Sequence, residues 1–170
     1  MGETEQKQIF DHWLKEHKGL FFKFVRAYAF TQNDRDDLFQ EIAVQVWRSI
    51  PNFKGDAAVT TWIYRITINT AIAWTRKEKK HQEGRQSFIE AEHLLKEANQ
   101  PDGRLDWLYE QISQLNEVDR TLTLLLLDGF SYKEMSKIIG ISESNVGVKI
   151  NRIKKVLITK SQENHSHHGI

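Results

Sequence analysis

A pair of helices joined by a tight turn is predicted between residues 131 and 157, and this pattern constrains the fold more than any other segment. Ser131 can cap the first helix, and Glu134 three residues later completes a capping box. Gly140 can end that helix in the left-handed conformation, and Ser142 can then cap a second helix. The apolar stripe of the second helix consists of Val146, Ile150, Ile153 and Leu157. This is the pattern of a helix-turn-helix, whose second helix normally enters the major groove of DNA.

The outward face of the second helix carries side chains suited to DNA. It presents Ser144, Val148, Asn151, Arg152 and Lys155, with Lys149 and Lys154 at its flank. Asn and Arg can contact base edges bidentately, lysine neutralises phosphate, and an outward valine can meet a thymine methyl. Residues 131–160 hold seven Lys or Arg against two Asp or Glu, a net +5, whereas 105–130 hold one against five, a net −4. The alternative is a helical hairpin with a solvated basic face, but turn, caps, stripe and charge together favour DNA binding.

Composition limits the classes of protein that fit. The chain has no cysteine, which removes disulfides, thiolate metal sites and cysteine nucleophiles, and which fits a reducing cytoplasm. No apolar run approaches the roughly 20 residues that cross a bilayer. The polar start MGETEQKQ also lacks the apolar core of a signal peptide. We therefore expect a cytoplasmic protein without membrane insertion.

Helical periodicity, only two prolines and almost no strand-like alternation predict an all-α fold. The 170 residues permit two small helical domains, which we expect at about 5–80 and 105–158. Residues 81–104 are polar and hold three basic against five acidic side chains, so we expect a flexible linker with one weak helix near Ser87–Ala98. A disordered tail is expected at 159–170.

The remaining helices are expected in both domains. In the first domain, residues 7–30 form one or two helices, and a helix opened by Asn33 or Asp34 covers 34–49. A further helix runs from Thr60 or Thr61 to about Lys80. In the second domain, a pair of helices covers 105–128, with a break near Leu115-Asn116.

The helix expected at 34–49 has two contrasting faces. Its core stripe consists of Leu38, Ile42 and Val46. The opposite face shows Asp37, Gln40, Glu41, Val44, Trp47 and Arg48. A mixed face with an exposed tryptophan is typical of a protein-binding patch, because Trp and Arg are enriched at interface hot spots. The alternative is that Trp47 packs against a neighbouring helix, and helical geometry alone leaves both interpretations open.

A loop follows at residues 52–59 and leads into an aromatic and basic helix. The loop begins with Asn52, Phe53 and Lys54, and one sector of the next helix carries Trp62, Arg65, Asn69 and Arg76. Aromatic side chains beside basic ones suit unstacked, single-stranded bases. Aromatic stripes at helical spacing are also typical of a core, so these residues alone do not decide between the two.

The two halves together resemble one known family. The first half resembles domain two of bacterial sigma factors over DRDDLFQEIAVQVWRSIPNFKGDAAVTTWIYRITINTAIAWTRKEKK, and the second resembles their domain four over SYKEMSKIIGISESNVGVKINRIKKVL. Short length, two domains and a variable linker match the extracytoplasmic-function (ECF) group. The specific signals are Asp37-Leu38-Phe39-Gln40-Glu41 followed by Trp47, and then the run from Phe53-Lys54-Gly55 to Thr61-Trp62-Ile63-Tyr64-Arg65-Ile66. The helix-turn-helix alone is not specific, because many regulators carry one.

The resemblance implies partners and roles for matching positions. The outward face of helix 34–49 would bind the β′ coiled coil of core RNA polymerase, and the β flap of the polymerase is a further expected contact. Loop 52–60 and the helix after it would recognise and melt the −10 element of promoter DNA, while helix 143–157 would read the −35 element. Members of the group are commonly held by an anti-sigma factor, which is therefore an expected partner. The family often has Lys and Ser or Arg where Gly147 and Val148 stand, so a less polar readout is expected here.

Two other classes of function compete with this interpretation. A stand-alone helix-turn-helix regulator would use the first domain as a sensor or dimerisation unit and would bind promoters tightly without polymerase. An enzyme would need a catalytic constellation, and the sequence holds no phosphate loop, nucleophile elbow or paired-carboxylate motif. The scattered histidines are His12, His17, His81 and His93, with His165, His167 and His168 in the expected tail. We therefore expect no catalytic residue, no metal site and no cofactor.

Overall fold

The computed structural model describes residues 1–82 and 103–167, and the regular structure of these residues is entirely helical, which confirms the all-α prediction. The chain divides into two compact units, Met1–Tyr109 and Glu110–Ile170. The helix predicted near Ser87–Ala98 lies outside the described residues, as does most of the predicted linker. The domain limits expected from the sequence, about 5–80 and 105–158, remain predictions.

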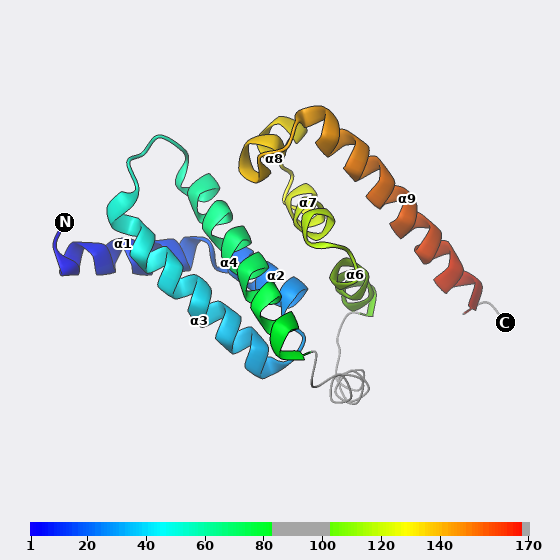
Figure 1. Cartoon of the computed structure of the whole chain (residues 1–170), viewed down its shortest axis with the longest axis horizontal. Helices are drawn as coiled ribbons and strands as arrows, with labels where there is room; N and C mark the ends of the chain where they lie inside the picture. Colours follow the sequence, from blue (N-terminus) through cyan, green and yellow to red (C-terminus); the bar gives the residue numbers. More distant parts are fainter. Residues whose placement is uncertain (83–102, 168–170) are drawn as a thin grey trace. The chain divides into compact units, whose positions relative to one another are not determined.

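Over residues 1–82, the N-terminal unit is a bundle of four α-helices with one short 3-10 turn (Figure 1). Its elements are α1 (Glu3–Glu16), α2 (Lys18–Tyr28), α3 (Gln32–Ser49), η1 (Ile50–Asn52) and α4 (Val59–Gln82). α1 and α2 meet at His17, so the stretch expected as one or two helices is two. α3 and α4 lie side by side, and α2 packs against both.

Two predicted helix starts are wrong by a few residues. Thr31 caps α3, because its hydroxyl accepts a hydrogen bond from the backbone N–H of Asp34 at 3.0 Å. Asn33 and Asp34 therefore lie inside the helix. α4 begins at Val59, and the carbonyl of Ala58 already accepts from the N–H of Trp62, so neither of the threonines at 60 and 61 is the cap.

The predicted core stripe of α3 is confirmed. Leu38, Ile42 and Val46 are fully buried, and they pack in the bundle with α2 and α4. The buried side chains that α2 and α4 contribute include Leu20, Phe21, Phe24, Val25, Ile63, Tyr64 and Ile68. Full burial of such a side chain contributes about 1.5–3 kcal/mol. The opposite side of α3 can therefore carry polar groups without any cost to the core.

The C-terminal unit contains the predicted helix-turn-helix. α6 (Gly103–Ser113) crosses the boundary between the units, and α7 (Glu117–Leu127), α8 (Tyr132–Ile139) and α9 (Glu143–His167) follow. Ser131 and Glu134 form the expected capping box, and Gly140 ends α8 with a left-handed φ of 83°. The Ser142 hydroxyl accepts from the N–H of Asn145, as expected of the α9 cap. Asn116 caps α7 at the predicted break between the helices of this pair.

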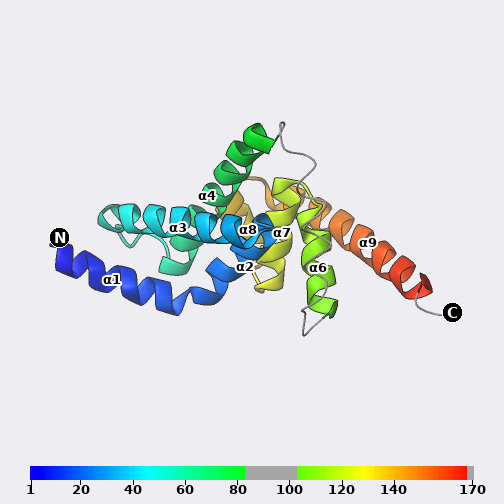
Figure 2. The ribbon, with the colours of Figure 1, turned by 90° about the horizontal axis from the view of Figure 1, so that it is seen from below.

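α9 is longer than the sequence pattern indicated. It continues as one helix to His167 (Figure 2), so the prediction of disorder is wrong for residues 159–167. The apolar stripe ends near Leu157, but no glycine or proline occurs between Gly147 and Gly169, and a helix without such a break propagates at little cost. Lys160 also donates from Nζ to Oε1 of Gln114 at 3.1 Å, which ties this part of α9 to the turn that follows α6.

Gly147 in the first turns of α9 leads to a stability prediction. A Cβ atom at this position would lie 3.6 Å from Cε2 of Tyr132, an ordinary van der Waals contact. Glycine inside a helix costs about 0.5–1 kcal/mol relative to alanine, so Gly147→Ala should raise the free energy of unfolding by about that amount. Urea denaturation followed by circular dichroism measures it. Gly140→Ala is the control and should be destabilising, because φ at Gly140 is +83°. A lower free energy of unfolding for Gly147→Ala would contradict this packing.

Candidate nucleic-acid and protein interfaces

The outward face of α9 is formed as the helical spacing predicted. Ser144, Val148, Asn151, Arg152 and Lys155 are exposed, while the stripe at positions 146, 150 and 153 is buried. Val148 is the unusual member, because 64% of this apolar residue is accessible. Lys149 is half-buried at the edge of the face. The structure therefore groups the six candidate residues on one helix and distinguishes five exposed members from a partly covered lysine.

A buried carboxylate on α7 lies beneath the basic part of this face. Asp119 is only 6% exposed, and its Oδ2 lies 3.4 Å from Nη2 of Arg152. Its Oδ1 lies 3.9 Å from Nζ of Lys149. In the sequence, Asp119 is only one of five acidic residues within residues 105–130. No periodic pattern could reveal the contact, because 33 positions separate Asp119 from Arg152.

The candidate protein-binding face of α3 is largely open. Its exposed residues are Asp37, Gln40, Glu41, Val44 and Arg48. Trp47 is half-buried, with its ring edge-on to Phe10 of α1 at a centroid distance of 5.3 Å. The carbonyl of Trp47 also accepts from Nε2 of Gln6 at 2.9 Å. Trp47 therefore packs against a neighbouring helix, which was the alternative left open, and it joins α1 to α3 beside the exposed face.

Phe53 of the loop after η1 and Trp62 of α4 are held within the N-terminal unit. Phe53 is half-buried between Trp13, at a centroid distance of 5.4 Å, and Trp62, at 5.6 Å. Nε1 of Trp62 donates to the hydroxyl of Ser49 at 3.2 Å. Phe53 and Trp62 thus fix the shape of the loop. The remaining candidates of this set are exposed: Asn52, Lys54, Arg65, Asn69 and Arg76.

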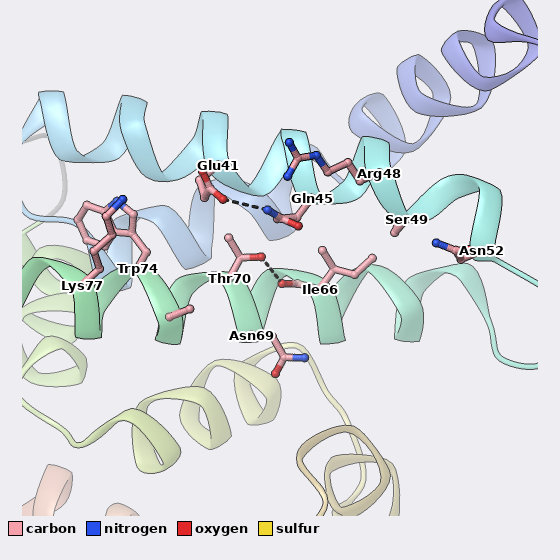
Figure 3. A pocket seen from close by; sticks show the side chains of 11 residues that line it. Glu41, Gln45, Arg48, Ser49, Asn52, Ile66, Asn69, Thr70, Trp74 and Lys77 are labelled. Carbon is pink, nitrogen blue, oxygen red and sulfur yellow. Dashed lines mark hydrogen bonds between the residues drawn. The ribbon is translucent and has the colours of Figure 1, made fainter.

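A groove of about 630 Å³ runs between α3 and α4 (Figure 3). Residues from both candidate sets line it: Glu41 and Arg48 from the α3 set, and Asn52 and Asn69 from the loop and α4. The lining also includes Gln45, Ser49, Ile66, Thr70, Ala73, Trp74 and Lys77. Asn52 lies at one end of the groove, while Trp74 and Lys77 lie at the other. The structure therefore brings residues of the predicted polymerase-binding set and of the predicted −10 set together in one groove.

The chemistry of this groove suits a polar, partly aromatic ligand. Gln45, Asn52 and Asn69 supply amides that can both donate and accept hydrogen bonds, as base edges require. Nε2 of Gln45 donates to Oε1 of Glu41 at 2.9 Å, which orients both side chains. Trp74 offers an indole ring at the far end. Gln45 and Trp74 were missing from the predicted set. Trp74 follows Ile63, Ile66 and Thr70 at helical spacing, which is typical of an apolar, core-facing side.

Other kinds of site have little support among the described residues. No group of three or more His, Cys, Asp or Glu side chains within 1–82 and 103–167 is arranged to hold a metal ion. In the same part of the chain, no helix combines the length and the apolar character that crossing a membrane requires. Nδ1 of His165 contacts the carbonyl of Ser161 within α9 at 2.7 Å.

Comparison with known proteins matches both halves of the chain. Residues 13–81 match Sigma-70 region 2, and residues 105–157 match Sigma-70 region 4, so the two matches together take in more than half of the chain. RNA polymerase sigma-H factor of Pseudomonas aeruginosa is 27% identical over 164 residues, which cover 89% of this chain and 85% of that protein. ECF RNA polymerase sigma-E factor of Escherichia coli K12 is 29% identical over 144 residues, covering 76% and 74%.

Solved structures with the same fold include two complexes. CnrH, solved with the cytosolic domain of CnrY, has a TM-score of 0.68 at 20% identity and covers 92% of this chain and 90% of its own. The sigma factor RpoE, solved with the anti-sigma factor NepR from Bartonella quintana, has a TM-score of 0.69 at 16% identity, with coverage of 87% and 93%. At these identities the likeness establishes the fold.

Proposed function

The chain belongs to the ECF group of the sigma-70 family, and from this membership we propose how its residues divide the work of promoter recognition. An ECF sigma factor binds core RNA polymerase and directs it to specific promoters. The observation that carries this function is the presence of region 2 and region 4 on one chain, in that order. A stand-alone regulator needs the helix-turn-helix but has no use for a region 2.

The α3 face is the proposed contact with the β′ coiled coil of core polymerase. Val44 is an apolar residue that is 42% exposed, and Asp37, Gln40, Glu41 and Arg48 surround it with polar groups. An apolar centre within a polar rim is the usual anatomy of a specific protein interface. Trp47 supports this face by packing on α1. Region 4 is proposed to meet the β flap.

The groove between α3 and α4, with the adjoining loop, is the proposed site for the −10 element. Promoter opening costs base stacking and pairing, and a protein offsets that cost by holding unpaired bases. Asn52 and Asn69 would contact bases of the non-template strand, while Lys54, Arg65 and Arg76 would lie along its phosphates. Phe53 and Trp62 keep the loop in the shape that this contact needs.

The outward face of α9 is the proposed reader of the −35 element. This element stays double-stranded, so a groove-reading helix with phosphate contacts is sufficient. The two domains can hold both promoter elements together only when polymerase fixes their spacing. The chain alone should therefore bind promoter DNA weakly. We place it in the cytoplasm with its polymerase and assign it no catalytic step and no cofactor.

An anti-sigma factor is the proposed regulatory partner. Region 2 and region 4 each present a surface that polymerase or DNA needs, so a protein that covers these surfaces would silence the chain. The RpoE structure of the same fold was solved with an anti-sigma factor, which supports this proposal by analogy.

A mobility-shift experiment tests the proposed function. A promoter fragment is incubated with the purified chain, with core polymerase, and with both. We expect a sequence-specific complex that survives a competitor polyanion only when chain and core are both present. A tight specific complex with the chain alone would favour the stand-alone regulator.

Positions along α9 should give different phenotypes. Substitution of Val148 or Asn151 by alanine should change which −35 sequences are used, because these side chains lie outward near the start of the helix. Lys155→Ala should weaken all promoters about equally and lower the salt dependence by about one ion. Transcription of a randomised −35 library by each mutant holoenzyme measures both effects. If only Lys155→Ala changes the sequence preference, the orientation of α9 on DNA is wrong.

A further inference from the structure

The carboxylate of Asp119 lies where α7 meets the DNA-facing helix. It is buried, yet both of its oxygen atoms are within ion-pair distance of cations on α9, Arg152 and Lys149. These cations occupy successive turns of the face proposed to read the −35 element. A group that cannot itself reach DNA therefore contacts two that can.

Asp119 is held in place by the cap of its own helix. Asn116 accepts from the backbone N–H of Asp119 at 2.9 Å and donates from Nδ2 to Oδ2 of the same residue at 2.9 Å. The carboxylate thus sits in the first turn of α7, where the helix dipole favours negative charge. These two hydrogen bonds with Asn116 hold the Asp119 carboxylate in one orientation.

Lys149 and Arg152 neutralise the charge of Asp119 to different extents. Oδ1 is buried and has no hydrogen-bond partner among the described residues, so the ammonium of Lys149 at 3.9 Å is the cation placed to balance it. The Lys149 side chain is only 27% exposed, which fits that role. The Arg152 side chain is 58% exposed, and its Nη2 points towards Oδ2 of Asp119. Since a guanidinium has several N–H donors in a rigid fork, its other donors stay available to a ligand.

We propose that Asp119 is a positioning residue for −35 recognition. It fixes the orientation in which Arg152 meets a base edge, and it keeps Lys149 from the phosphates. An arginine that is already oriented loses less rotamer freedom when it binds, so discrimination between bases improves. The inference rests on the proposed reading of the −35 element by α9. It assigns part of the specificity to α7, a helix with no proposed contact with DNA.

Asp119→Asn tests this proposal in the reconstituted holoenzyme, because it removes the charge and keeps the shape. Transcription of a randomised −35 library should show about tenfold less discrimination at one base position, since one oriented arginine contact is lost. The salt dependence of promoter binding should steepen by about one ion, because Lys149 is released to a phosphate. A residue that only stabilised the fold would lower activity on all sequences and would leave both measures unchanged.

Three further variants separate the possible outcomes. Glu110→Gln removes the same charge from an exposed site on α6 and should change neither measure. Asp119→Asn should have no further effect on base preference in an Arg152→Ala background.

If Asp119→Asn fails to fold, Asp119→Glu replaces it as the test. This variant keeps the charge but displaces it, so it should change base preference with the salt dependence unaltered. Wild-type selectivity retained in the folded Asp119 variants would overturn the inference, whereas a wild type without any −35 preference would overturn the proposed role of α9 itself.

Discussion

Replacing Asp37 and Gln40 together by alanine should weaken binding to core RNA polymerase by about thirtyfold or more, the loss expected when a hot spot is truncated. Both side chains are exposed on α3, on the side away from its fully buried stripe. Their removal therefore deletes polar contacts of the proposed interface and leaves the core intact. The helical circular dichroism should not change.

Competition against labelled wild-type chain for core polymerase measures this loss. Gln32→Ala with Asp36→Ala is a matched control, because it removes the same two residue types from exposed positions of the same helix. Nε2 of Gln32 donates to Oδ1 of Asp36, so this control also deletes a side-chain hydrogen bond of α3. We expect the control to compete like wild type. If the Asp37 and Gln40 variant also does so, the polymerase-binding face is assigned wrongly.

Replacing Arg65 and Asn69 by alanine should reduce open complexes about tenfold to a hundredfold, because each captured base is worth about 1–3 kcal/mol. Both residues are exposed on α4, and Asn69 lines the groove shared with α3. Closed complexes should be affected much less, since α9 and phosphate contacts hold the duplex. The defect should therefore appear at the melting step.

Permanganate footprinting of unpaired thymines measures opening, and a mobility shift at low temperature measures closed complexes. The closed complex serves as the internal control for folding and for polymerase binding. A footprint as strong as that of wild type would remove Arg65 and Asn69 from the −10 site. Equal loss of both complexes would assign them to general DNA affinity.

Local signals explain why the helix-turn-helix was predictable. The capping box of Ser131 and Glu134, the left-handed Gly140 and the cap at Ser142 each act within a few residues, so the sequence alone contains them. The start of α3 was missed by a narrow margin. Asn33 and Asp34 are as suitable for a cap as Thr31, and only the geometry shows that the Thr31 hydroxyl makes the bond.

Contacts between distant segments could not be predicted in this way. Helical spacing left open whether Trp47 is an exposed anchor or packs on a neighbouring helix, because spacing alone cannot show that Phe10 lies against it. The pairing of Asp119 with Arg152 was equally unpredictable, because it depends on how α7 and α9 pack. The groove between α3 and α4 could not be predicted either. Its lining comes from two helices whose candidate residues were predicted to serve different functions, polymerase binding and −10 recognition.

Mapping transcription start sites in vitro tests the central claim most directly. Core polymerase transcribes genomic DNA from the native cell with and without the purified chain, and the 5′ ends are sequenced. We predict a set of new starts that share one −35 and −10 pair at fixed spacing, all of them absent with core alone. Identical starts with and without the chain would contradict the assignment of this protein as a sigma factor.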